Sequence, residues 1–127
     1  MIRGLTRCAL VLAAALTAGA VAAQEAPEGL AEAPGAVLRG LDKVAGTASD
    51  ITLAVGQTAT FGKITVTLRE CRYPADDPSS NAYAYLIIAD IGASAPDFAG
   101  WMIADSPALS ALDHQRYDVW VIRCKID

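Results

Sequence analysis

The chain has 127 residues and a formal net charge of −4. This length fits one domain, and the acidic balance argues against nucleic-acid binding, because an acidic surface repels phosphate backbones. The hydrophobic content of 54% is inflated by the N-terminus, so it does not indicate a membrane protein.

Residues 1–23 have the order of a secretory signal peptide. Arg3 and Arg7 precede an apolar run from Ala9 to about Leu16, and small residues follow up to Ala23. This order predicts export and cleavage after Ala23. The apolar run is short for a membrane span, so we expect no transmembrane segment after cleavage. Removing two positive charges from a chain of net charge −4 leaves a mature chain of −6.

Export would leave two of the three cysteines, Cys71 and Cys124. An even number of cysteines in an oxidising compartment predicts a disulfide. The two positions are 53 residues apart (124 − 71), whereas redox-active pairs are usually separated by two residues. We therefore interpret the pair as a structural cross-link, which would stabilise the domain by about 4 kcal/mol in the chain-entropy model.

Residues 24–36 are rich in Ala, Glu, Pro and Gly, a composition that buries too little apolar surface to fold. We predict a flexible linker there and a β domain over residues 37–127. Within that domain, alternating apolar residues separated by turn residues predict strands. These cover residues 37–44, 51–55, 63–71, 83–90, 98–104 and 117–124, with 57–61 as a connector or a short edge strand.

The clearest strand is KITVTLREC, in which Ile64, Val66 and Leu68 share one face. By strict alternation Cys71 falls on the opposite face, so we expect either a β-bulge or a covered polar face there. In the last strand, alternation likewise places Cys124 opposite Val121.

Ser106 and Pro107 predict the start of a helical turn over residues 106–112, with Ser106 as the N-cap and Pro107 at the first helical position. Leu109 and Leu112 lie three residues apart and would dock this turn. Together the elements predict a mainly all-β fold, either a small antiparallel sandwich or a partly closed barrel. It would have about six strands, one short helical turn near 106–112 and one disulfide.

Three stretches carry a resemblance to a known family: LRGLDKVAGTASDITLAVGQTATFGKITVTLREC, YAYLIIAD and GWMIADSPALSALDHQRYDVWVIRC. They resemble a family of small exported proteins of Gram-negative bacteria that is catalogued only as a domain of unknown function. The similarity covers roughly residues 37–124. It implies a periplasmic or envelope setting, and it carries no activity, ligand or catalytic residue.

Few residues point to catalysis or metal binding. His114 is the single histidine, and as a general base it would need a nucleophile and an orienting acid, for which Asp113 or Asp118 are candidates by sequence. Ser106 is better explained by capping. Asp76 and Asp77 lie in a loop that lacks the ligand ladder of a calcium site. We therefore predict no catalytic residue, no metal and no cofactor.

The aromatic residues of the last three strands are the candidate binding surface, with burial of several of them in the core as the alternative. A sheet that buries one face only would present some of them to solvent, where they could bind an envelope protein, a glycan or a lipid. Arg69, Glu70, Arg72, Arg123 and Lys125 flank the cysteines and form either a solvated ion-pair cluster or a polar rim. We predict a non-enzymatic periplasmic binding module, with a small periplasmic enzyme based on His114 as the alternative. The candidate residues are Tyr83, Tyr85, Trp101, Tyr117 and Trp120.

Overall fold

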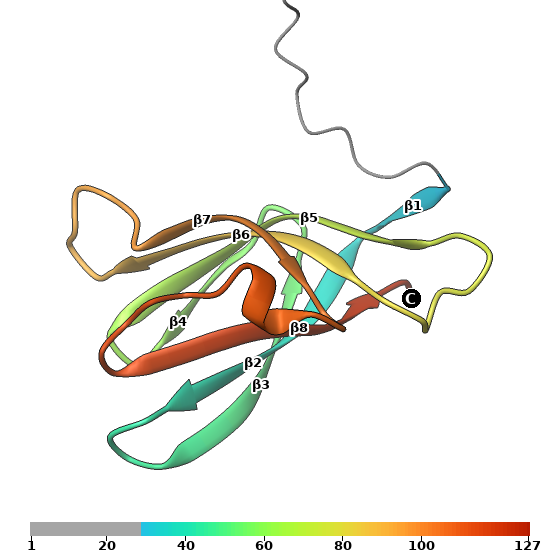
Figure 1. The fold of residues 1–127 in the computed structure, drawn as a ribbon. Helices are drawn as coiled ribbons and strands as arrows, with labels where there is room; N and C mark the ends of the chain where they lie inside the picture. The colour runs from blue at the N-terminus through green and yellow to red at the C-terminus, as the bar shows by residue number, and fades with distance from the viewer. Residues whose placement is uncertain (1–28) are drawn as a thin grey trace, which may run out of the picture.

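A computed structural model describes residues 29–127, so the expected signal peptide and the first residues of the expected linker lie outside the described part of the chain. The described residues form eight strands and one short 3-10 turn (Figure 1). In chain order these are β1 (Leu30–Ala33), β2 (Gly35–Asp42), β3 (Thr47–Ala54), β4 (Thr58–Phe61), β5 (Ile64–Pro74), β6 (Tyr83–Asp90), β7 (Phe98–Ile103), η1 (Pro107–Leu109) and β8 (Tyr117–Lys125).

The strands make two antiparallel sheets. The larger sheet has the order β1-β5-β6-β7. The fifth strand, β4, pairs with the same edge of β5 as β1 does, but at the opposite end of that strand. The smaller sheet has the order β3-β2-β8. The two sheets pack face to face, which confirms the predicted antiparallel fold and decides for the sandwich over the partly closed barrel.

The prediction of a flexible linker over residues 24–36 is wrong for its second half. Leu30–Ala33 is a strand that pairs with Cys71–Pro74 of β5, and β2 begins at Gly35. Pairing with the edge of β5 satisfies the backbone of this segment, a long-range effect that composition does not reveal. Gly35 fits because a Cβ there would lie 2.7 Å from the carbonyl oxygen of Leu53.

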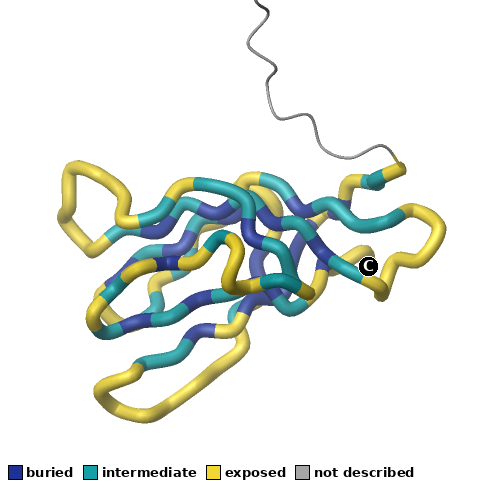
Figure 2. Tube along the Cα trace, viewed as in Figure 1, coloured by how far each residue is buried: buried dark blue, intermediate teal, exposed yellow. Residues whose placement is uncertain are grey.

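The core lies between the sheets, where buried residues of the two layers form one cluster (Figure 2). In β5 and β6, the inward residues are fully buried while their neighbours are half-buried or exposed. The largest buried side chains are Leu38, Leu53, Ile64, Leu68, Leu86, Ile88, Met102 and Tyr117.

Two β-bulges turn the cysteines inward. In β5 the pairing with β6 skips Arg69, so that Cys71 changes face and is 1% exposed. In β8 the pairing with β2 skips Ile122, so that Cys124 joins the face of Val121. The expectation that Cys124 lies opposite Val121 is therefore wrong, and of the two alternatives expected for Cys71 the β-bulge is the one present.

The predicted disulfide is present. Cys71 and Cys124 are bonded, with their Cα atoms 5.8 Å apart. Because β5 belongs to the larger sheet and β8 to the smaller one, the bond ties the two layers of the sandwich together.

The helical turn is shorter than expected, and its capping differs. A 3-10 turn covers Pro107–Leu109, and Ser106 makes no side-chain capping hydrogen bond. Leu112 is buried, whereas Leu109 is 77% exposed. The prediction that both leucines dock the turn is therefore wrong for Leu109. Helical spacing would place the two side chains on one face, but the turn has only three residues and ends before Leu112. No helix in the described part of the chain is long and apolar enough to cross a membrane.

Candidate functional site

The five aromatic candidates lie in three different places. Tyr83, Tyr85 and Trp101 occupy the outer face of the five-stranded sheet, because their strand neighbours Ala84 and Met102 point into the core. This grouping follows from the β6–β7 register, which places Tyr85 opposite Trp101.

The other two candidates do not belong to this face. Tyr117 is 2% exposed and packs edge-on against Phe61 in the core, so its assignment to a binding surface is wrong. The hydroxyl of Tyr117 accepts a hydrogen bond from the backbone N–H of Lys63, which explains how a tyrosine is tolerated there. Trp120 is half-buried and lies on the smaller sheet opposite Arg39.

We define the aromatic face as the half-buried residues Tyr83, Tyr85, Ile87, Trp101 and Ile103, which share the outer side of β6 and β7. The rings of Tyr85 and Trp101 meet edge to face, with centroids 5.4 Å apart. This geometry suits the quadrupoles of two aromatic rings.

Arg72 completes the aromatic face; from the sequence it was expected only as part of an ion-pair cluster or polar rim around the cysteines, not as a neighbour of the aromatic residues. Its guanidinium lies over the Trp101 ring, 5.8 Å from the centroid. Its Nη2 atom also lies 3.1 Å from Glu70 Oε1 and 3.4 Å from Glu32 Oε1. The bulge at Arg69 places Glu70 and Arg72 beside the aromatic strands, opposite Tyr85 and Tyr83. Strict alternation would have placed both side chains inward, so the sequence pattern alone did not reveal that they lie on the outer face.

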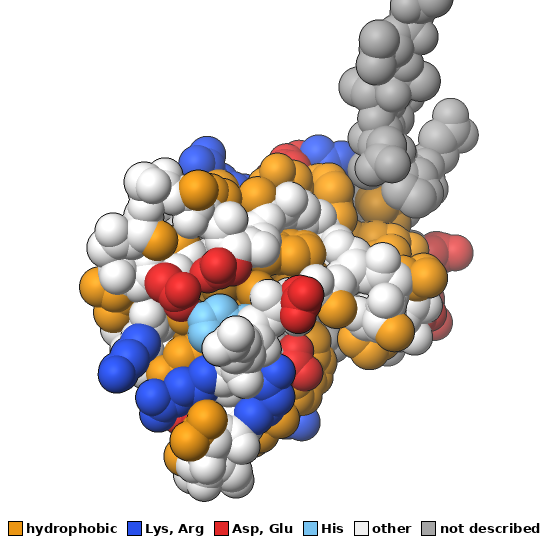
Figure 3. Space-filling view, turned by 60° about the vertical axis from the view of Figure 1, so that its left-hand side comes forward, with side chains coloured by type: hydrophobic (Ala, Val, Ile, Leu, Met, Phe, Trp, Pro, Cys, Tyr) orange, Lys and Arg blue, Asp and Glu red, His pale blue; other side chains and the backbone are white. Residues whose placement is uncertain are grey.

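A second candidate site surrounds His114 at one end of the sandwich. A cleft of about 520 Å³ is lined by Lys63, Asp90, Ile91, His114, Arg116 and Tyr117. Figure 3 shows the histidine between acidic and basic side chains on this side of the molecule. The cleft joins the ends of β6 and β8 and the turn between β4 and β5.

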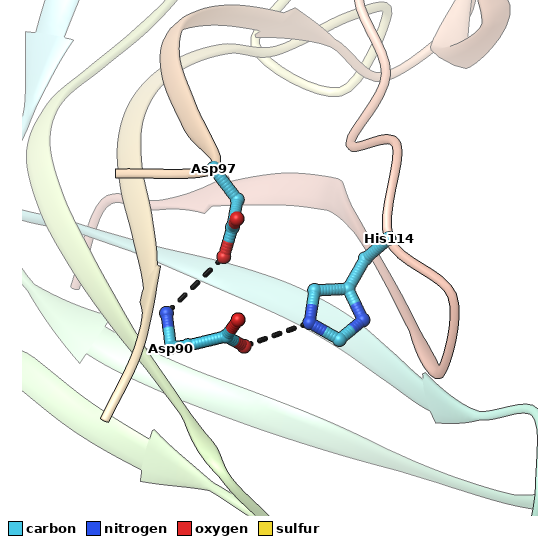
Figure 4. A group of neighbouring side chains, drawn as sticks. All are labelled: Asp90, Asp97 and His114. Atoms are coloured by element: carbon cyan, nitrogen blue, oxygen red, sulfur yellow. Dashed lines mark hydrogen bonds and ion pairs between the residues drawn. The ribbon is translucent and has the colours of Figure 1, made fainter. Parts of the chain in front are cut away.

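His114 bonds to neither acid expected from the sequence. Its Nε2 atom lies 2.8 Å from Asp90 Oδ1, at the end of β6 (Figure 4). Its Nδ1 atom accepts hydrogen bonds from the backbone N–H groups of Arg116 and Tyr117, at 3.0 and 3.1 Å. The enzyme hypothesis that paired His114 with Asp113 or Asp118 is therefore wrong in its partner, because chain folding brings β6 to the imidazole.

These bonds fix the tautomer of His114. Because Nδ1 accepts two N–H groups, the ring proton resides on Nε2, which donates it to Asp90. In a catalytic His–acid pair the second ring nitrogen faces the nucleophile. Here that nitrogen is held by the backbone, so neither nitrogen is available as a base.

The same bonds bear on metal binding. Asp90, Asp97 and His114 each offer a ligand atom within 4.8 Å of the others. A metal-bound imidazole normally donates its other ring N–H to an acceptor, whereas Nδ1 of His114 faces two donors. Asp97 instead accepts from the backbone N–H of Asp90. The arrangement therefore fits a hydrogen-bonded network better than it fits a metal centre.

An ion pair beside the cleft holds Arg116, the residue just before β8, against Asp42 at the end of β2. Arg116 donates to both carboxylate oxygens of Asp42, and its Nη2 lies 3.0 Å from Oδ2. The Arg116 guanidinium, and after it the backbone N–H groups of Ala45 and Val44, hold the pKa of the Asp42 carboxyl below its ordinary value. Asp42 is thus charged at neutral pH and anchors both the β2–β3 turn and the start of β8.

Comparison with known proteins places the chain in a family. Residues 36–124 match the family described as "Uncharacterized protein conserved in bacteria" (DUF2155). The chain belongs to this family. This confirms the resemblance to a family of unknown function. The strand β1 lies before the matched residues.

A curated relative is Uncharacterized protein RP359 of Rickettsia prowazekii (strain Madrid E). It is 28% identical over 87 residues, which are 66% of this chain and 56% of the relative. The chain thus spans little more than half the length of that protein. No solved structure matches the chain significantly.

Proposed function

We propose that this protein is an exported, non-enzymatic binding module of the periplasm whose aromatic face docks on another envelope protein. The observation that carries the proposal is the edge-to-face pair of Tyr85 and Trp101 with Arg72 over it, on the outer side of a sheet. A sheet face turned to solvent is normally polar, so half-buried aromatic and aliphatic groups there need a reason.

The composition of the aromatic face favours a protein partner over a glycan or a lipid. Trp, Tyr and Arg are the residues that dominate binding energy at protein interfaces. Arg72 is already held by Glu32 and Glu70, so little rotamer entropy would be lost on docking. Those two carboxylates supply the polar rim that surrounds such a centre.

Export is supported by two features. The order of residues 1–23 is that of a signal peptide, and a disulfide persists in an oxidising compartment such as the periplasm. Intact-mass measurement of the protein from the periplasmic fraction should give a chain that begins at Gln24.

The enzyme hypothesis rests on the cleft at His114, where an acid does lie within hydrogen-bond reach. We rank it second because the free nitrogen that a general base requires is bonded to the backbone. His114 is better explained as a link between the end of β6 and the start of β8.

The test compares matched variants in a crosslinking pulldown from envelope extracts. Trp101→Ala should remove capture of the partner, because truncating an interface anchor costs more than about 2 kcal/mol. Trp120→Ala makes the same change on the smaller sheet and should retain capture, and circular dichroism should show both variants folded. Loss of function in a folded His114→Ala protein that still captures the partner would instead favour the enzyme.

A further inference from the structure

The strand β3 is an outer edge of the three-stranded sheet. It pairs with β2 through eight residue pairs without a register shift, and within residues 29–127 no strand pairs with its other side. Residues 47–50 are exposed on both faces, and Figure 2 shows this hairpin projecting from the body of the sandwich.

The hydrogen bonds at the end of β3 show which backbone groups point outward. The N–H of Ala54 donates to the side chain of Gln57, and its carbonyl oxygen accepts from the N–H of Gln57. Ala54 therefore does not bond to β2. Because antiparallel pairs alternate, the N–H and C=O groups of Thr52, Asp50 and Ala48 also point away from β2. The backbone N–H and C=O groups of these three residues therefore form a row of outward-pointing donors and acceptors along the edge.

This edge lacks the usual protection. Natural edge strands are shortened, bulged, or marked by charged side chains or Pro. Thr47–Ala54 is long, unbulged and free of Pro, and its single charged residue, Asp50, is paired with Arg39 of its own sheet. The opposite edge of the same sheet differs, because Pro107, Ala108 and Ala111 of the β7–β8 connection lie beside Asp118–Trp120 of β8. The outermost strands of the larger sheet, β1, β4 and β7, are all shorter than β3.

We propose that β3 pairs antiparallel with β3 of a second copy of this chain, which joins two three-stranded sheets into one sheet across a twofold axis. Asp50 of each copy lies opposite Thr52 of the other, and the outward groups of these residues exchange four backbone hydrogen bonds. Ile51 faces its own counterpart on the axis. The half-buried Ile51 side chain thereby gains an apolar neighbour.

The side chains of β3 favour a second copy as the occupant. In this register no two like charges face each other, since the only charged residue of the strand, Asp50, is opposite Thr52. Asp50 is also neutralised within its own copy by Arg39, at 2.8 Å. Shifting the register by one pair so that Asp50 faced Asp50 would place two carboxylates together, so the charges select the pairing around Ile51.

Sedimentation equilibrium of the purified, exported protein tests this pairing. The wild type should form a dimer that dissociates on dilution. Thr52→Pro removes an outward N–H that β2 does not use, so the fold should survive while dimer affinity falls by about tenfold or more. Thr52→Ala keeps the N–H and should dimerise like the wild type. A wild type that stays monomeric at all concentrations, or a folded Thr52→Pro that dimerises normally, would overturn the proposal.

A crosslink tests the register without relying on proline. Residues that face each other in a non-hydrogen-bonded pair have Cα atoms about 4.5 Å apart, within the range of a disulfide. Ile51→Cys should therefore give a covalent dimer under mild oxidation, with Cys71–Cys124 intact by peptide mapping. Val44→Cys, at the exposed hairpin tip, is the control. Equal crosslinking of the two variants, or none at position 51, would contradict the pairing.

Discussion

At the scale of single residues, two bulged residues determine which side chains of β5 and β8 face the core. Arg69 and Ile122 are the bulged positions in β5 and β8. Each bulge reverses the alternation of side chains after it. The reversal in β5 brings Cys71 into the core and places the Arg72 guanidinium over the Trp101 ring on the aromatic face. The reversal in β8 brings Cys124 to meet Cys71.

The packing of the Tyr117 ring depends on a glycine at position 62. Gly62 has a φ of +56°, and a Cβ there would lie 2.8 Å from Tyr117 Cζ and closer still to the hydroxyl oxygen. The tyrosine cannot move away easily, because its hydroxyl is bonded to Lys63 and its ring packs against Phe61.

We therefore expect Gly62→Ala to lower the free energy of unfolding by about 2–4 kcal/mol, from left-handed strain and overpacking together. Gly46→Ala is the matched control, since Gly46 also has a positive φ but nothing within 4 Å of its Cβ position. It should cost only about 1–2 kcal/mol. Urea unfolding of both variants measures the difference, and equal losses would show that Tyr117 accommodates the methyl group.

At the scale of elements, the connection between β7 and β8 is attached to the core by one buried leucine, in addition to the hydrogen bond from His114 to Asp90. The η1 turn is too short to stand alone, and none of its own three residues is buried. Leu112, which follows the turn, is 7% exposed and belongs to the core cluster. The connection is therefore anchored after the turn, between η1 and His114.

Leu112→Ala should destabilise the domain by about 2–5 kcal/mol, because it opens a cavity at a buried site. Leu109→Ala makes the same truncation at an exposed site and should change stability by less than about 0.5 kcal/mol. Thermal unfolding followed by circular dichroism separates the two. If both variants unfold like the wild type, the connection contributes nothing to the core.

At the scale of the whole molecule, the disulfide is a covalent cross-link between the sheets in addition to the chain connections. Backbone pairing holds each sheet together, whereas side-chain packing, a few side-chain hydrogen bonds and Cys71–Cys124 hold the two layers together. A core of this size leaves a small margin of stability, so a cross-link has a large relative effect.

Replacing Cys71 and Cys124 together by Ala should lower the free energy of unfolding by about 2–5 kcal/mol. Each single Cys→Ala variant should fall close to the double variant, because either change breaks the same bond. Denaturant unfolding gives the values, and non-reducing peptide mapping of the wild type should show the two cysteine peptides joined. Free thiols at both positions would contradict the cross-link.

The sequence by itself determined the features that depend on local pattern. Two-residue alternation located β5, β6 and β8, turn residues separated them, and the even number of cysteines outside the predicted signal peptide indicated the disulfide. These succeed because a strand that buries one face must alternate, and because two cysteines in an oxidising compartment pair.

Only the tertiary structure decided how distant segments meet. The β1 strand exists because β5 offers it an edge, and His114 binds Asp90 because β6 ends beside the β7–β8 connection. The aromatic residues separate into an outer face and a core because β6 and β7 turn one side to solvent while Tyr117 closes one end. Each of these depends on register, and a single bulged residue changes the face of every side chain after it.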